Sequence, residues 1–324
     1  MKKVLGMGNA LVDIMTMLEN DKLLSEFDLP KGSMQLVDAL RAEKIKIGIA
    51  GLKQEIASGG SAANTINGLA YLGVDTGYIG KIGNDVIGDL FRKGLEEINV
   101  QAQLLIGNMP SGTAIALVSP DAERTFATHL GAAIELTPDD LQDDLFEGYH
   151  YFHIEGYLVQ NHELIRQAVQ KAAAKGLTIS LDMASYNVVE ANLEFLKEII
   201  RDYVDIVFAN EEEAKALTGK EPEAALNELA EMCDIAVVKI GKGGSFIKSS
   251  GKTHKVGIIE VNSIDSTGAG DLYAAGFLYG MVHDMSLDRC GKIGALLAGN
   301  VLEVLGARMD QSRWIKIKET LKSI

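Results

Sequence analysis

Short apolar runs alternate with longer helix-like segments through most of the chain, and this alternation restricts the fold more than any other feature. The apolar runs have the length of buried strands and lie at residues 3–8, 75–83, 149–154, 177–183, 204–210 and 234–241. Amphipathic segments of helical length lie between them, at residues 62–73, 85–99, 162–176 and 192–203. A repeated strand–helix–strand order with apolar strands predicts an α/β fold, in which helices cover both faces of a mainly parallel sheet. Ligands of such sheets bind at the carboxyl ends of the strands.

One region departs from this order. Residues 100–130 read as consecutive strands separated by turns of Pro, Gly and Ser, and residues 33–38 resemble a further short strand. We expect them to form a small antiparallel sheet of about four strands that stands over the ends of the main sheet as a lid. The lid segments, about 14–40 and 100–130, are then inserted in a single domain of residues 1–324. The alternative is that these strands extend the main sheet.

The charge balance restricts the partners. The 324 residues include 45 acidic and 31 basic side chains, a formal net charge of −14. This argues against nucleic acid or an anionic membrane as a partner, because both require a basic surface. A phosphate ligand remains compatible, because backbone amides can form such a site. The two cysteines, Cys233 and Cys290, are too few for a disulfide framework, so we expect a reduced, cytoplasmic setting. No apolar run reaches the ~18 residues of a transmembrane helix.

Three motifs resemble known binding sites but lack the required context. The segment "GMGNAL" has Leu11 where a dinucleotide fingerprint needs its third glycine. The segment "FIKSSGKT" has Phe246 in place of the first glycine of a P-loop and joins two expected strands, so we predict a hairpin turn. His150 and His153 have no further ligands nearby in the sequence, and we expect a structural role for them.

The segment "DSTGAGD", residues 265–271, precedes the apolar run "LYAAGFLYGMV" and carries the clearest chemistry. A glycine-rich turn at a helix start leaves backbone N–H groups free to bind an anion, assisted by the helix dipole. A carboxylate beside such a site would repel the anion, unless it serves as a base. Phosphoryl transfer needs both parts, because amides stabilise the transferred group while Asp271 takes the proton of the attacking hydroxyl. A simple helix cap is the alternative.

Further motifs occur in the same order as in one known family. They are "GNALVDI" (8–14), "SGGSAANTINGLAYLG" (58–73), "GKIGNDVIGD" (80–89) and "NEEEA" (210–214). With "DSTGAGD", they resemble the signatures of the ribokinase (PfkB) family of sugar and nucleoside kinases and span nearly the whole chain. The resemblance implies a three-layer sandwich with a small β-sheet lid. It also implies ATP-dependent transfer of the γ-phosphate to a primary CH₂OH group.

The resemblance also implies roles for individual residues. Asp271 is the general base, and the anion hole consists of Gly268, Ala269 and Gly270. The substrate contacts are Asn9, Asp13, Gln35, Gly60, Ser61, Asn64 and Tyr157. The nucleotide contacts are Asn210, Gly241, Gly244, Thr267 and Arg124. Asn210 and Glu213 would hold Mg²⁺ through water, and Asp265 would hold either the loop or a monovalent cation such as K⁺. For "NEEEA" the alternative is an acidic helix start, and for Arg124 an exposed strand residue.

The acceptor remains open at this point. "GNALVDI", "KGSMQLVD" and "ERTFATHLGAA" look most like the adenosine-kinase-like branch, with Tyr157, Gln35 and Leu36 as a wall for the base. Against this branch, Leu158 stands where a second aromatic is expected. Lys239 also departs from the family pattern, which often has Thr there. The alternatives are a free sugar such as ribose or fructose, and a non-catalytic binding module. Both a monomer and a homodimer fit the sequence.

Overall fold

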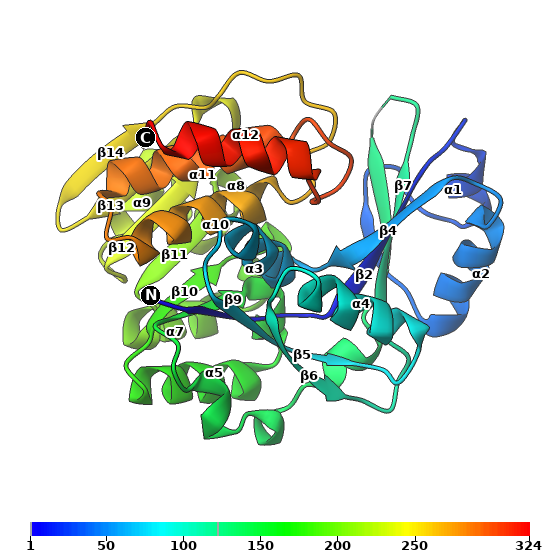
Figure 1. Cartoon of the computed structure of the whole chain (residues 1–324), viewed down its shortest axis with the longest axis horizontal. Coiled ribbons are helices and arrows are strands. Elements are labelled where there is room, and N and C mark those ends of the chain that lie inside the picture. Colours follow the sequence, from blue (N-terminus) through cyan, green and yellow to red (C-terminus); the bar gives the residue numbers. More distant parts are fainter. Residues whose placement is uncertain (1, 122) are drawn as a thin grey trace.

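The computed structural model describes residues 2–121 and 123–324, and its largest element is a nine-stranded sheet (Figure 1). The strand order is β14-β13-β12-β11-β10-β9-β1-β5-β6. The bounds are β1 Val4–Met7, β5 Thr76–Ile82, β6 Gln101–Ile106, β9 Tyr151–Glu155, β10 Thr178–Asp182, β11 Ile206–Asn210, β12 Ile235–Lys239, β13 Ser245–Ser249 and β14 Lys252–Val256. From β12 to β6 all pairings are parallel, while β13 and β14 form an antiparallel hairpin. The predicted parallel sheet and the hairpin at the "FIKSSGKT" motif are therefore confirmed.

Helices cover both faces of this sheet, because successive strand residues point to opposite sides. Val4 and Ile206 belong to one apolar cluster, while their neighbours Leu5 and Val207 belong to another. The first cluster includes α3 Ser61–Tyr71, α4 Val86–Glu96, α10 Ala269–Val282, α11 Leu287–Val301 and α12 Gln311–Leu321. The second includes α5 His162–Ala174, α6 Tyr186–Ala191, α7 Leu193–Tyr203, α8 Glu211–Thr218 and α9 Pro222–Leu229. The predicted three-layer α/β sandwich is confirmed.

A second, five-stranded sheet, called the small sheet below, stands beside the carboxyl ends of the main strands (Figure 1). Its order is β3-β8-β7-β2-β4, with bounds β3 Met34–Leu36, β8 Arg124–His129, β7 Gly112–Val118, β2 Leu11–Met17 and β4 Gln54–Gly59. Helices α1 Lys22–Glu26 and α2 Ala39–Ile49 lie on its outer side. Val12 and Ile14 of β2 pack in the same cluster as Ile45 of α2, so the alternate residues Leu11 and Asp13 face the other way.

The sequence-based description of this sheet was wrong in three respects. Residues 101–106 pair with β5 in the main sheet, so the segment 100–130 is divided between two sheets. Residues 11–17 and 54–59 belong to the small sheet, which gives it five strands rather than four. The pairings β2–β7 and β3–β8 are parallel, so the small sheet is mixed. The reason is that an apolar alternation predicts a strand but not its partner.

His153 is fully buried in β9, where its Nδ1 lies 2.9 Å from the hydroxyl of Ser180, and burial lowers the pKa of its imidazole to about 4. This contact gives His153 the structural environment expected of it.

No helix in the ranges 2–121 and 123–324 has the length and apolar character needed to cross a membrane.

Candidate active site

A single cleft of about 1980 Å³ brings together almost all of the predicted site residues. It lies where the carboxyl ends of the main strands meet the small sheet, and its lining includes both Asn9, which follows β1, and the start of α10. The predicted residues that line it are Asn9, Asp13, Gly60, Ser61, Asn64, Arg124, Tyr157, Asn210, Glu213, Gly241, Gly244, Thr267, Gly268, Ala269, Gly270 and Asp271. Gln35 and Asp265 lie outside this lining.

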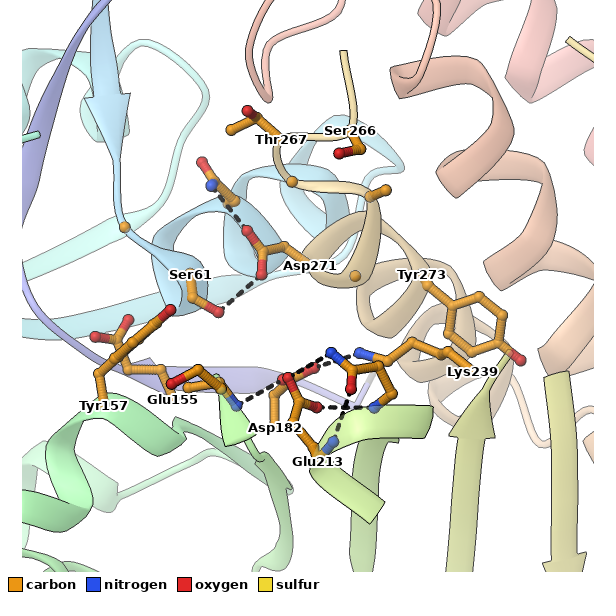
Figure 2. Close-up of a pocket in the computed structure, with 18 of the residues that line it drawn as sticks. Ser61, Glu155, Tyr157, Asp182, Glu213, Lys239, Ser266, Thr267, Asp271 and Tyr273 are labelled. Atoms are coloured by element: carbon orange, nitrogen blue, oxygen red, sulfur yellow. Dashed lines mark hydrogen bonds and ion pairs between the residues drawn. The ribbon is translucent and has the colours of Figure 1, made fainter. Parts of the chain in front are cut away.

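Asp271 stands in the first turn of α10, and its carboxylate is oriented by two residues of α3 (Figure 2). The Ser61 hydroxyl donates to Oδ1 at 2.8 Å, and the Asn64 amide donates to Oδ2 at 2.9 Å. Loss of solvation raises the pKa of Asp271 to about 6, and the two hydrogen bonds oppose that rise. The result is a carboxylate of fixed orientation whose ordinary pKa has moved toward neutrality, which suits a general base.

The turn before Asp271 presents free backbone donors to the cleft. Gly268 has φ +74°, a left-handed conformation that favours glycine, and it caps the helix start. The amides of Gly268 and Gly270 have no hydrogen-bond partner within the described chain, while that of Ala269 reaches the Ser266 carbonyl at 3.3 Å. Free amides at the positive end of a 14-residue helix form an anion-binding geometry.

Asp13 is a second carboxylate that faces the cleft, from β2 of the small sheet. Burial and the nearby charge of Asp271 raise its pKa to about 7, while Arg308 acts in the opposite direction. Its carboxyl group fills the space beside Gly59, where an added Cβ would lie 2.1 Å from the Asp13 carboxyl carbon. Glycine is required at Gly60 as well, since its φ is +93° and a Cβ would lie 2.4 Å from the Asn9 carbonyl oxygen. The "GG" pair thus lets backbone and carboxylate meet at the edge of the cleft.

Glu155, the last residue of β9, is a cleft residue that the sequence analysis missed. Its Oε1 accepts from the backbone and side-chain amides of Asn9, at 2.9 and 2.7 Å, and its Oε2 accepts from the Ala62 backbone amide at 3.0 Å. Burial raises its pKa to about 7, although these hydrogen bonds favour the charged form. Glu155 therefore orients Asn9 and caps the start of α3. Its position at the end of an apolar strand is the signal that could have identified it.

Asp182 and Lys239 occupy the equivalent strand-end positions on β10 and β12. The Lys239 ammonium donates to Asp182 Oδ2 at 3.0 Å, and both side chains are largely buried. The sequence analysis noted Lys239 only as a departure from the family pattern and did not single out Asp182. Figure 2 shows this pair beside Glu213, below the start of α10.

Asn210 and Glu213 form a capping box at the start of α8. The Asn210 side chain accepts from the Glu213 amide at 2.8 Å, and Glu213 accepts from both amides of Asn210 at 2.8 and 2.7 Å. The helix start that the sequence offered as an alternative role is therefore present. Both residues also line the cleft, and burial raises the pKa of Glu213 to about 7. Their oxygen atoms and that of Asp182 are the donor type that Mg²⁺ prefers. Among the described residues, no group of three or more His, Cys, Asp or Glu side chains is arranged to hold a metal ion.

Asp265 lies beneath the glycine turn and holds it in place. Its Oδ1 accepts from the Thr267 amide and hydroxyl, both at 2.8 Å, and its Oδ2 accepts from the Gly306 amide at 2.7 Å. Arg124, from β8, lies 2.7 Å from Asp265 Oδ1 and also donates to the hydroxyls of Ser266 and Thr267. The small sheet is therefore tied to the turn through one arginine, which is not the exposed strand residue of the alternative.

Gln35 is not brought to the cleft. Strand alternation places its neighbours Met34 and Leu36 in the cleft lining, while Gln35 pairs in register with the fully buried Ala127 and lies within 3.3 Å of the Ser33 hydroxyl. The apolar side of the cleft consists instead of Leu11, Met34, Leu36, Ala114, Phe126, Leu130, Ala133, Leu136 and Leu158. Tyr157 lines the cleft next to Glu155, and burial raises the pKa of its hydroxyl.

The turn after β12 supplies the far end of the cleft. Gly241 and Gly244 have φ of +51° and +89°. A Cβ on Gly244 would lie 2.0 Å from the Val256 carbonyl oxygen, so this position requires glycine. Residues 257–263 and the α11 residues Ala295, Ala298 and Gly299 continue the lining beyond this turn. The cleft is therefore long enough to extend from the small sheet to the second half of the main sheet.

Comparisons with known proteins agree with this geometry. An adenosine kinase from Sinorhizobium meliloti is 36% identical with a TM-score of 0.89, over 98% of this chain and 99% of that one. A probable sugar kinase from Rhizobium etli is 35% identical with a TM-score of 0.89, over 98% of both chains. A nucleoside kinase of Methanocaldococcus jannaschii is 28% identical over 82% of this chain and 85% of its own.

The family model described as "pfkB family carbohydrate kinase" matches residues 37–313, most of the 324-residue chain. The resemblance read from the sequence motifs is thereby confirmed. Kinases of this family use ATP as co-substrate. The chain therefore belongs to the pfkB family and is a sugar or nucleoside kinase, rather than the non-catalytic binding module that the sequence had left open.

Proposed function

We propose that this kinase transfers the γ-phosphate of ATP to the primary CH₂OH of a ribonucleoside, with adenosine as the favoured acceptor. One observation carries the proposal: a single cleft holds an oriented carboxylate, Asp271, beside the free amides of Gly268 and Gly270, and Asp13 of the small sheet lines the same cleft.

In the proposed reaction Asp271 is the general base. The acceptor oxygen forms a bond to the γ-phosphorus as the bond from phosphorus to the β,γ-bridging oxygen breaks, and ADP leaves. Asp271 takes the hydroxyl proton, and the amides of residues 268–270 stabilise the charge on the transferred group. Asn9, Asp13 and Asn64 would bind the sugar hydroxyls, since carboxylate and amide oxygens accept from them.

The apolar side of the cleft supports a nucleoside acceptor. Phe126, Leu36 and Leu130 line it on the small-sheet side, and Tyr157 lines the same cleft. A heteroaromatic base needs such an apolar wall, whereas a free sugar offers hydroxyls in every direction. The adenosine kinase from S. meliloti, alike over nearly the whole chain, supports the same choice.

For the nucleotide we propose the far end of the cleft. Gly241, Gly244 and Thr267 lie along it, and Arg124 would reach the phosphates from β8. Asn210 and Glu213 would hold Mg²⁺ through water, which suits an ion that dehydrates reluctantly. When bound, the ion would neutralise charge on the phosphates. Activation by K⁺ near Asp265 is a separate proposal, tested by comparing rates in KCl and in choline chloride.

We also propose that the small sheet closes over the acceptor as a lid. It forms one wall of the cleft, and Arg124 already ties it to the glycine turn. Closure predicts slower hydrogen exchange in β7 and β8, residues 112–118 and 124–129, when adenosine and a non-hydrolysable ATP analogue are bound. Unchanged exchange in these strands would argue against a lid.

The second candidate acceptor is a free sugar such as ribose or fructose. It is supported by the polar group Asn9, Asp13 and Asn64 and by the similarity to the probable sugar kinase from R. etli. A coupled ADP-release assay with Mg·ATP, run over ribonucleosides and free sugars, separates the two. The nucleoside proposal predicts that kcat/KM is highest for adenosine and that Phe126→Ala lowers it mainly through KM. A higher kcat/KM for ribose or fructose, with kcat/KM unchanged in Phe126→Ala, would contradict the nucleoside proposal and support a free sugar as acceptor.

A further inference from the structure

Lys239 projects from the end of β12 into the proposed phosphate site. Its ammonium lies directly below Gly270, since a Cβ added to Gly270 would stand 3.1 Å from Nζ. The absence of a side chain at Gly270 therefore does two things: it exposes a backbone amide and it leaves room for this ammonium.

The surroundings of Lys239 are strongly acidic. Asp182 accepts from its ammonium, and the charges of Glu213 and Asp271 act on it as well. Loss of solvation disfavours a charged lysine, but these three carboxylates outweigh it and the pKa of Lys239 is raised. Tyr273 and the imidazole of His153 also lie within its electrostatic reach. The ammonium thus stays charged, in a region with more acids than bases.

Such a region would repel the phosphates of ATP unless cations, from side chains or from bound Mg²⁺, balance its negative charge. Within the described chain, the cationic residues that line the cleft are Arg124, Lys239 and Lys242. Arg124 is engaged with Asp265, and Lys242 is exposed in the turn after β12. Lys239 differs from both, because its ammonium lies beside Gly270 and its carboxylate partner, Asp182, also lines the cleft.

We propose that Lys239 is a cationic contact for the terminal phosphate of ATP, held ready below Gly270 by Asp182 and drawn to the phosphate when the nucleotide binds. This inference rests on the proposed function, because it takes residues 268–270 as the anion site. It adds a side-chain charge beside the backbone amides of residues 268–270.

The experiment must separate this role from simple neutralisation of Asp182. Lys239→Met removes the charge at nearly constant length but leaves a buried carboxylate without its partner, which destabilises the fold. The double variant Lys239→Met/Asp182→Asn removes both charges and relieves that penalty. Asp182→Asn alone is the matched control, because Asp182 itself lines the cleft. A purely structural lysine predicts that the double variant binds nucleotide as Asp182→Asn does.

Relative to Asp182→Asn, we expect the double variant to bind the non-hydrolysable analogue AMP-PNP at least about tenfold more weakly and to lose roughly 10² in kcat, as for loss of one oxyanion-hole donor. Adenosine affinity should change by less than about twofold, because only the phosphate contact is lost. Calorimetric titration of AMP-PNP and adenosine supplies the binding readout. Equal AMP-PNP affinity in the double variant and in Asp182→Asn would overturn the inference. If the wild-type chain phosphorylates no acceptor, the proposed function fails, while the titration still decides the role of Lys239.

Discussion

The hydroxyl of Ser61 donates a 2.8 Å hydrogen bond to Oδ1 of Asp271, across 210 residues of sequence. Asn64, one helical turn later in α3, donates to the other oxygen at 2.9 Å. Both carboxylate oxygens therefore have a protein donor before any acceptor is present. Ser61 and Asn64 consequently set the orientation and basicity of Asp271 in addition to any contact with the substrate.

Replacement of Ser61 by alanine should raise the pKa of Asp271. Because the hydroxyl stabilises the carboxylate, its loss should move the acidic limb of the kcat/KM profile upward by about one pH unit. The rate at pH 8, where Asp271 is ionised in either protein, should fall only by a few fold. Ser61→Thr keeps a hydroxyl and serves as the matched control. Superimposable profiles for Ser61→Ala and wild type would show that the hydrogen bond does not tune the base.

The wild-type rate itself should depend on pH through Asp271. Its pKa of about 6 means that the carboxylate is ionised above pH 6 and increasingly protonated below it. Since only the ionised form can accept a proton, kcat/KM should fall about tenfold for each unit below that value. Initial rates from pH 5 to 8.5 at constant ionic strength test this. A profile that stays flat down to pH 5 would be incompatible with a base of this pKa.

The free energy of unfolding should decrease as the pH rises toward neutrality, which is the reverse of what carboxyl groups with lowered pKa values produce. Burial raises the pKa of Asp13, Glu155 and Glu213 to about 7, so the folded chain binds more protons than the unfolded chain between about pH 4.5 and 7. The stabilising contribution of these groups is full below the unfolded pKa values and is lost as the pH rises through about 7. The free energy of unfolding of the ligand-free protein should therefore be larger at pH 5.5 than at pH 7.5, measured by urea denaturation.

Glu155 provides the specific test of that slope. Glu155→Gln removes one of the titrating groups and should reduce the difference between the two pH values. Glu194→Gln, on the exposed side of α7, is the matched control and should leave it unchanged. A wild-type protein that becomes more stable from pH 5.5 to 7.5 would contradict the assignment, as would an unaltered slope in Glu155→Gln.

Arg124 should couple the small sheet to the glycine turn. Arg124→Met removes the contact with Asp265 and the donors to Ser266 and Thr267. We expect faster hydrogen exchange in residues 265–268 and a KM for ATP raised by roughly tenfold, the scale of a lost charge-assisted hydrogen bond. Arg201→Met, on an exposed helix position, controls for loss of charge. If exchange and KM both match the control, the coupling is absent.

Local patterns in the sequence were enough to predict the layers of the fold and most of the residues of the site. The parallel sheet follows from apolar run lengths, and the helix start at Asp271 follows from the glycines before it, since both are local signals. Strand partners are not local: residues 101–106 look like the strands that follow them, yet pair with β5. Likewise, the side chains of β3 alternate between two faces, and only the register of this strand places Met34 and Leu36, rather than Gln35, on the face toward the cleft.

The missed residues share one property. Glu155, Asp182 and Lys239 each end a buried strand of the main sheet. Their importance comes from partners far along the chain, such as Asn9 for Glu155 and Gly270 for Lys239. A polar residue that closes an apolar strand is the pattern that would have identified all three.

The central claim is tested most directly by Asp271→Asn. Formation of the 5′-phosphate of adenosine from Mg·ATP should be readily measured for the wild type, while the variant should lose at least about 10³ in kcat, because an amide cannot accept the proton. Its affinity for adenosine and AMP-PNP and its urea midpoint should stay near those of the wild type. A fully folded Asp271→Asn protein that forms the phosphorylated product at a rate close to the wild type would contradict the account.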